Sequence, residues 1–184
     1  MNWHIREAVR QIAAGGIIAY PTETVYGLGC DPLNGDAVLR LLALKQRSLE
    51  QGLILIASHF GQLEPLLLPL DPAVRERVAR PGATPVTWVL PCLPDVPKWL
   101  RGRHDSLAVR ITTHPLAAAL CDTWDGPLVS TSANLHGRQP ATTPLAIRRA
   151  FNNRLDYILH GATGAGYRHS EIRNGLTGAI LRPR

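Results

Sequence analysis

The stretch GIIAYPTETVYGLGCD, residues 16–31, joins a short apolar run to a cluster of threonines, a glutamate and glycines. Residues 16–20 are apolar and β-prone, and Pro21 ends the run, which is the pattern of a buried strand with a sharp stop. In open α/β sheets, ligands bind in the crevice outside the strand ends. A hairpin or turn with its polar residues in solvent is the alternative, but Tyr26 and Leu28 are too apolar for an exposed turn. The sequence therefore favours a strand followed by a ligand-binding segment, whose glycines let the backbone approach the ligand closely.

The composition is typical of one soluble globular domain spanning residues 1–184, with 45% hydrophobic and 18% charged residues. No apolar run is long enough to cross a membrane, and the first residues lack the apolar region of a signal peptide. Three widely spaced cysteines (Cys30, Cys92 and Cys121) contain no CxxC pair, so the pattern indicates neither a zinc site nor a disulfide framework. We expect a cytoplasmic protein without a protein-bound metal.

The net charge of +6 and the pI of about 9.8 are compatible with an anionic partner such as a nucleotide or RNA. The basic residues are almost all arginines and are scattered along the chain, which an ordinary arginine-rich surface explains equally well. A non-catalytic basic protein that binds tRNA or ribosomal RNA therefore remains an alternative. Against it, the sequence contains no basic patch interleaved with aromatic residues and no RNA-recognition signature.

Strands and helices mix without strict alternation, which predicts a single α/β domain with a twisted mixed sheet. Periodicity and breakers predict strands at 16–20, 52–57, 85–90, 106–112, 126–130, 155–159 and 178–181. Helices are predicted at 3–14, from an N-cap at Asp36 to about Lys45, and at 60–68, 71–80, 115–124 and 144–151. The glycine-rich run 161–166 leads into a polar segment and not an apolar helix, so we expect a mobile loop or lid there.

Three further clusters carry chemistry. Lys45 and Arg47 lie at a predicted helix end, where their cations could converge on a polyphosphate; an ordinary basic helix C-terminus is the alternative. Residues 130–134 (STSAN) place three hydroxyls and an amide after a strand, and an N-cap with a turn is the alternative. Arg110, inside an apolar strand, needs an anionic partner, which is either a structural ion pair or a ligand.

Taken in order, these motifs resemble the YrdC/TsaC family, the threonylcarbamoyl-AMP synthases, over nearly the whole chain. They are PTETVYGLG (21–29), Lys45-x-Arg47, PVT (85–87), SLAVR (106–110), His114-Pro115, STSAN (130–134) and SEIR (170–173). Each motif alone is weak, but seven in the same order are specific. The extent of the chain resembles the short, single-domain bacterial form.

The resemblance implies a YrdC-like α/β fold, with a twisted mixed sheet flanked by helices and a concave basic face. It implies synthesis of threonylcarbamoyl-AMP and pyrophosphate from L-threonine, bicarbonate and ATP, with Mg²⁺ arriving on the ATP. The product would serve N6-threonylcarbamoyladenosine modification of tRNA through a separate threonylcarbamoyl transferase complex. Weak direct binding of tRNA or other RNA is also compatible with the charge.

By matching motif, Lys45 and Arg47 are the expected catalytic residues and hold the triphosphate. The expected threonine-binding residues are Thr24, Thr87, Arg110 and Thr131. The expected nucleotide-binding residues are Ser132, Asn134, Ser170, Arg173 and Arg182, besides Lys45 and Arg47. Glu23 is expected to be structural.

Two departures from the family pattern concern threonine recognition. The stretch 81–87 is longer than the PGPxT of many relatives, which leaves the placement of Pro81 and Gly82 open. Ile56 occupies the place of a histidine that many relatives carry, so a polar contact to threonine is absent or supplied elsewhere, for example by water.

Overall fold

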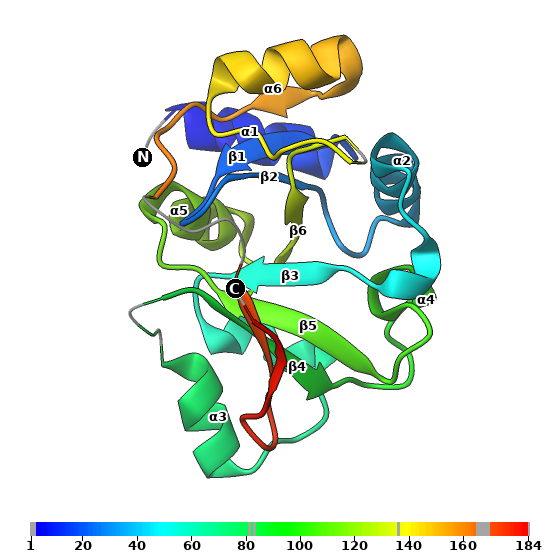
Figure 1. The fold of residues 1–184 in the computed structure, drawn as a ribbon, viewed down its shortest axis with the longest axis vertical. Helices are drawn as coiled ribbons and strands as arrows, with labels where there is room; N and C mark the ends of the chain where they lie inside the picture. The colour runs from blue at the N-terminus through cyan, green and yellow to red at the C-terminus, as the bar shows by residue number, and fades with distance from the viewer. Residues whose placement is uncertain (1–2, 81, 83, 136, 165–169, 184) are drawn as a thin grey trace.

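The structure is a computed structural model that describes residues 3–80, 82, 84–135, 137–164 and 170–183. Within these residues, nine strands form one mixed sheet in the order β7-β1-β2-β6-β3-β5-β4-β8-β9. Figure 1 shows α3 at the opposite end of the molecule from α6, with the C-terminal strands beside β4. The predicted α/β fold with a mixed sheet is therefore confirmed.

The opening stretch forms a β-hairpin, β1 (Ile18–Pro21) and β2 (Tyr26–Gly29), paired antiparallel from Ile18↔Gly29 to Pro21↔Tyr26. The strand before Pro21 is confirmed, but the glycines lie in a second strand and not in a loop. Gly29 is required by packing, because a Cβ there would lie 2.2 Å from the carbonyl oxygen of Val129. The hairpin interpretation and the binding interpretation are thus compatible, since the polar tip between the two strands lines a pocket.

The remaining strands are β3 (Ile54–Ala57), β4 (Val86–Pro91), β5 (Ser106–Ile111), β6 (Leu128–Ser132), β7 (Tyr157–Ile158), β8 (Glu171–Asn174) and β9 (Ile180–Arg182). Strand β6 pairs antiparallel with both β2 and β3, and so joins the hairpin to the rest of the sheet. Parallel pairs join β1 to β7, β3 to β5 and β4 to β8, which makes the sheet mixed.

The α-helices are α1 (Trp3–Ala13), α2 (Gly35–Lys45), α3 (Pro72–Ala79), α4 (Lys98–Arg101), α5 (Pro115–Trp124) and α6 (Pro144–Phe151). Short 3-10 turns lie at Leu49–Gln51, Phe60–Gln62, Glu64–Leu66 and Asn152–Arg154. The predicted helix at 60–68 is therefore two 3-10 turns. The cap of α2 is also two residues earlier than predicted, because the Asn34 side chain accepts the Ala37 N–H and Asp36 lies within the first turn.

Helices cover both faces of the sheet, and alternate residues of each strand enter different cores. One core contains residues of α1 and α5, packed against Ile18, Tyr20 and Ile56. The other contains residues of α2 and α6, packed against Ala19 and Leu55. This alternation places Ile56, the departure noted above, in a core beneath the sheet, where only 1% of its surface is exposed.

Candidate functional site

A pocket of about 410 Å³ opens over the sheet, large enough for a small-molecule site. Side chains from the hairpin tip and from β2, β3, β5, β6, β8 and β9 line it. Seven predicted site residues lie in this wall: Thr24, Arg47, Arg110, Thr131, Ser132, Ser170 and Arg182. The wall therefore brings together residues from nearly the whole length of the chain, from Thr22 to Arg182.

Hydrogen bonds within the hairpin tip fix the orientation of Thr24. The Thr22 hydroxyl donates to the Val25 carbonyl at 2.7 Å and accepts the Thr24 N–H at 3.3 Å. Beyond the tip, the Gly164 N–H donates to the Thr22 carbonyl at 3.0 Å. Thr24 is consequently held against the pocket by its own turn and by the contact from Gly164. Residues 165 and 166 of the expected lid lie outside the described residues, as does Pro81.

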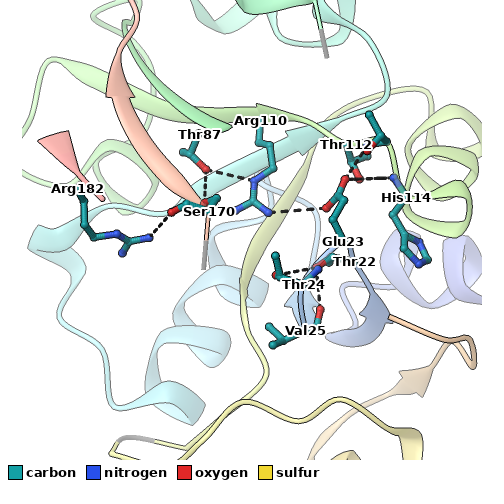
Figure 2. A network of polar contacts seen from close by, with 11 residues as sticks. Thr22, Glu23, Thr24, Val25, Thr87, Arg110, Thr112, His114, Ser170 and Arg182 are labelled. Carbon is teal, nitrogen blue, oxygen red and sulfur yellow. Dashed lines mark hydrogen bonds and ion pairs between the residues drawn. The ribbon is translucent and has the colours of Figure 1, made fainter. Parts of the chain in front are cut away.

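Arg110 lies at the centre of a polar network, between Ser170 and Glu23 (Figure 2). Its Nε donates to the Thr87 hydroxyl at 3.2 Å, and its Nη2 donates to the Ser170 hydroxyl at 2.8 Å. Its Nη1 lies 3.9 Å from Oε2 of Glu23, close enough for an ion pair and too far for a hydrogen bond. The structural ion pair is thus present, and Arg110 also lines the pocket. Thr87 is fully buried behind it and supports the guanidinium.

Glu23 anchors the hairpin tip to the turn before α5. Its Oε1 accepts hydrogen bonds from the Thr112 hydroxyl (2.6 Å), the Thr113 N–H (2.7 Å) and the His114 N–H (3.1 Å). Burial alone would raise the pKa of Glu23, but the hydrogen bonds from Thr112 and the backbone and the charge of Arg110 lower it below its ordinary value. The carboxylate is therefore ionised at neutral pH, and its contacts fit the structural role expected from the sequence.

Lys45 lies under the pocket wall with its ammonium enclosed by three oxygens. Its Nζ donates to the Ser132 carbonyl (2.6 Å), to the Asn134 carbonyl (2.5 Å) and to Oδ1 of Asn134 (2.7 Å). The Ser132 hydroxyl donates to the same Oδ1 at 2.7 Å. Burial and the neighbouring charge of Arg47 lower the pKa of Lys45 to about 8. All three protons have protein acceptors, so Lys45 fixes the turn after β6 and leaves Ser132 at the pocket surface.

Arg47 and Arg182 supply positive charge that the pocket wall does not neutralise. Arg47 donates through Nη2 to the Gly52 carbonyl at 2.9 Å, and its buried Nε has no hydrogen-bond partner among the residues that the structure describes. Arg182 donates to the Ser170 carbonyl at 3.2 Å. Burial lowers the pKa of Arg47, and so does the charge of Arg182. Among the described residues, the lining contains no aspartate or glutamate, so this region is suited to a polyanion.

Four predicted residues do not line the pocket. Lys45, Thr87 and Asn134 support its wall through hydrogen bonds. The fourth is Arg173. Its guanidinium pairs with Glu171 on the same strand. Sequence reasoning missed Arg101 and His104, which line the pocket between α4 and β5. The basic run RGRH, residues 101–104, directly before the strand that carries Arg110, was the available signal.

The described residues contain no group of three or more His, Cys, Asp or Glu side chains that could hold a metal ion. Hydroxyls and carbonyls at the turn after β6 are the oxygen donors near the cationic region. Such donors suit a Mg²⁺ ion that a triphosphate already carries. In the same described part of the chain, no helix is long and apolar enough to cross a membrane.

Comparison with known proteins gives consistent matches. Residues 10–183 match the family model Sua5_yciO_yrdC, described as "Telomere recombination". A protein of Nitrosococcus oceani named threonylcarbamoyl-AMP synthase is 57% identical over 181 residues, covering 98% of each chain. The structure of an H234A/Y235A variant of P. abyssi Sua5 matches with a TM-score of 0.90 and 33% identity, over 98% of this chain and 56% of that one. The structure of P. abyssi Sua5 complexed with L-threonine matches with a TM-score of 0.86 and 32% identity, over 94% of this chain and 51% of that one.

Proposed function

This chain belongs to the Sua5/YciO/YrdC family, and we propose on that premise that it is a threonylcarbamoyl-AMP synthase. It joins L-threonine, bicarbonate and ATP into threonylcarbamoyl-AMP and pyrophosphate. The observation that carries the proposal is a single pocket lined by three arginines, with Arg110 bound to the hydroxyls of Thr87 and Ser170 and Arg47 close to the charge of Arg182. Such a pocket is suited to bringing two anionic reactants together.

L-threonine occupies the region of Arg110, Thr24 and Thr131. Arg110 receives the carboxylate, since its guanidinium is held by Thr87 and Ser170 and faces the pocket. Thr24 and Thr131, which line the same pocket, supply hydroxyls for the threonine side chain and amine. Ile56 is buried and does not line the pocket, so a polar contact from that position is not part of this model of recognition.

The triphosphate of ATP, with its Mg²⁺, occupies the region of Arg47, Arg182 and Ser132. The two arginines supply charge where negative charge accumulates on the phosphoryl oxygens. Lys45 contributes indirectly, because it holds the Ser132–Asn134 turn in place through three hydrogen bonds. The magnesium ion neutralises part of the phosphate charge when it is bound with ATP.

The reaction requires positioning more than a protein nucleophile. The threonine amine attacks the carbon of CO₂ or bicarbonate, and a carbamate forms with release of a proton to water in the first case and with loss of water in the second. A carbamate oxygen then attacks the α-phosphorus of ATP, and the bond from that phosphorus to the pyrophosphate oxygen breaks. The residues of the two regions hold the carbamate and the α-phosphate in line, which supplies most of the acceleration.

The product, a mixed anhydride, serves the threonylcarbamoylation of N6 of an adenosine in tRNA, by way of a separate transferase complex. We place this work in the cytoplasm, where ATP and tRNA are available. Direct tRNA contact, if present, would be weak and salt-dependent, because it would rest on charge alone.

The test is release of pyrophosphate from ATP and Mg²⁺ in the presence of L-threonine and bicarbonate. We expect release only when both are added, and replacement of threonine by other amino acids should reduce it. Release independent of either reactant contradicts the proposal. Tight, ATP-independent tRNA binding at physiological salt without any pyrophosphate release would instead support the non-catalytic RNA-binding alternative.

A further inference from the structure

Glu23 has one carboxylate oxygen that its structural role does not use. Oε1 makes all three anchoring hydrogen bonds to residues 112–114. Oε2 is buried and, within the described part of the chain, has no hydrogen-bond partner. A glutamine could accept the same three bonds through its amide oxygen. The anchoring function therefore does not explain why a charge is present.

The unused oxygen faces Arg110. Oε2 lies 3.9 Å from Nη1 of Arg110, and both side chains are largely buried, with 12% and 9% of their surfaces exposed. Two opposite charges at this distance interact strongly in a partly buried setting, even without a hydrogen bond. Figure 2 shows the carboxylate on the opposite side of the guanidinium from Ser170.

We propose that Glu23 is a specificity-determining counter-ion, which cancels the charge of Arg110 so that this region accepts an amino-acid zwitterion and discriminates against simple anions. The inference rests on the proposed function, which assigns the threonine carboxylate to Arg110. A ligand with both a carboxylate and an ammonium group loses little binding affinity through Glu23, because the Glu23 carboxylate attracts the ammonium group while it repels the ligand carboxylate. A phosphate or an amine-free carboxylate is opposed only.

The other cationic region lacks such a counter-ion. The described lining contains no carboxylate, so Arg47 and Arg182 keep their full attraction for phosphate. This difference in local charge directs two anionic reactants to different parts of one pocket of about 410 Å³. The triphosphate is directed to Arg47 and Arg182, and the amino acid to Arg110.

The test compares binding of L-threonine with binding of 3-hydroxybutyrate, which is threonine without its amino group, by calorimetry in the absence of ATP. In the wild-type protein we expect threonine to bind more tightly. Glu23→Gln should narrow the ratio of the two dissociation constants by about tenfold or more, since one unit charge a few ångströms away is removed. Glu23→Asp keeps the charge and should keep most of the ratio.

Thr112→Val is the matched control, because it removes one hydrogen bond to Oε1 and leaves the carboxylate charge. It should lower thermal stability and leave the ratio unchanged. A folded Glu23→Gln protein with the wild-type ratio overturns the inference. If Glu23→Gln does not fold, inhibition of the wild-type enzyme by pyrophosphate is the second test. We expect pyrophosphate to compete with ATP and not with threonine. Competition with threonine overturns the inference.

Failure of this inference is distinguishable from failure of the proposed function. Threonine- and bicarbonate-dependent pyrophosphate release by the wild-type enzyme tests the function alone. If that release is observed and Glu23→Gln leaves the ratio of the two dissociation constants unchanged, the proposed function is supported and the proposed role of Glu23 is wrong. If that release is absent, the proposed function fails whatever the binding ratio is.

Discussion

Two cations of one motif, Lys45 and Arg47, lie two residues apart and have opposite surroundings. The helix α2 ends at Lys45, and Gln46 adopts a left-handed conformation (φ 49°), which turns the chain there. Lys45 consequently points to the turn after β6, whereas Arg47 lines the pocket. The spacing alone predicted that both cations converge on one polyphosphate. In the structure only Arg47 of the two lines the pocket, and we propose that it contacts the ligand. Lys45 instead orients the turn after β6.

Replacement of Arg47 by alanine should lower kcat by about 10²–10³, the usual effect of losing one preorganised group that stabilises charge in the transition state. The measurement is the steady-state rate of pyrophosphate release at saturating ATP, threonine and bicarbonate. Arg80→Ala is the matched control, because this exposed arginine pairs only with the neighbouring Glu76 and its loss changes the net charge equally. A rate within twofold of the wild type for Arg47→Ala would remove Arg47 from the site. Lys45→Ala should lower kcat by a similar factor, because the turn after β6 loses the cation that holds it in place.

The pKa of Lys45 is directly measurable, since the chain contains only one other lysine, the exposed Lys98. In the NMR spectrum of isotopically labelled lysine, the Lys45 signal should titrate near pH 8 in place of the ordinary 10.5. The folded protein loses this proton near pH 8 and the unfolded chain near 10.5. Unfolding therefore takes up a proton between these values, and this group makes the folded state more stable as pH rises from about 8 to 10.5.

The control for that titration is Lys98→Arg, which leaves one lysine signal and so fixes the assignment. The three oxygens around Nζ oppose the effect of burial, because they favour the ammonium form. If they outweigh it, the Lys45 signal will titrate at or above 10.5, and the predicted pH dependence of stability will be absent.

At the scale of elements, strand β2 depends on its glycines. A Cβ at Gly29 would lie 2.2 Å from the Val129 carbonyl oxygen, the same oxygen that accepts the Tyr20 hydroxyl at 3.1 Å. Gly29→Ala should therefore lower the free energy of unfolding by about 1–3 kcal/mol or more, as overpacking of a core does. Urea denaturation measures the change. Gly126→Ala, whose Cβ would meet nothing closer than 3.5 Å, should change little, and equal stability of the two variants would contradict the argument.

Elements with strong local signals were predictable, and elements defined by their neighbours were not. Helix α1 and strands β4 and β5 were predicted to within a few residues, because their apolar periodicity and their bounding glycines and prolines are local. Strand β2 was missed because glycine disfavours strands, and its two glycines are explained only by Tyr20 and Val129 packed against them. Strand β8 was also missed, because its sequence is mostly polar. It is stabilised by pairing with β4, which a local pattern does not show.

The same distinction holds for the site. Arg110 was identifiable as an isolated charge in an apolar strand. The enclosure of Lys45 by Ser132 and Asn134 was not, since 87 and 89 positions separate the partners. Arg101 and His104 were missed because the short helix α4, which ends at Arg101, has too few residues to show a period.

At the scale of the whole molecule, the pocket is a product of the sheet order. Strand β6 links the hairpin β1–β2 to β3, and the C-terminal strands return to the far side of β4. Thr24 on the hairpin and Arg182 on the last strand thereby line one pocket. The predicted concave basic face remains a prediction beyond this wall, but the topology explains how distant motifs form one site.

Because the pocket spans parts of the sheet that are remote in sequence, bound ligands should stabilise the whole fold. At 100 times its dissociation constant, each ligand adds about 2.7 kcal/mol, which corresponds to a rise in Tm of roughly 5–10 °C for a chain of this size. Arg47→Ala should lose the shift caused by Mg²⁺-ATP and keep the shift caused by threonine. Arg110→Gln should show the reverse pattern, since it alters the other cationic region.

Thermal unfolding of the wild type and both variants, with each ligand separately, measures these shifts, and Arg80→Ala again controls for net charge. The argument depends on two regions that bind independently within one pocket. If Arg47→Ala abolishes both shifts while the protein remains folded, the two regions are not separable, and the division of the pocket into an amino-acid side and a phosphate side is wrong.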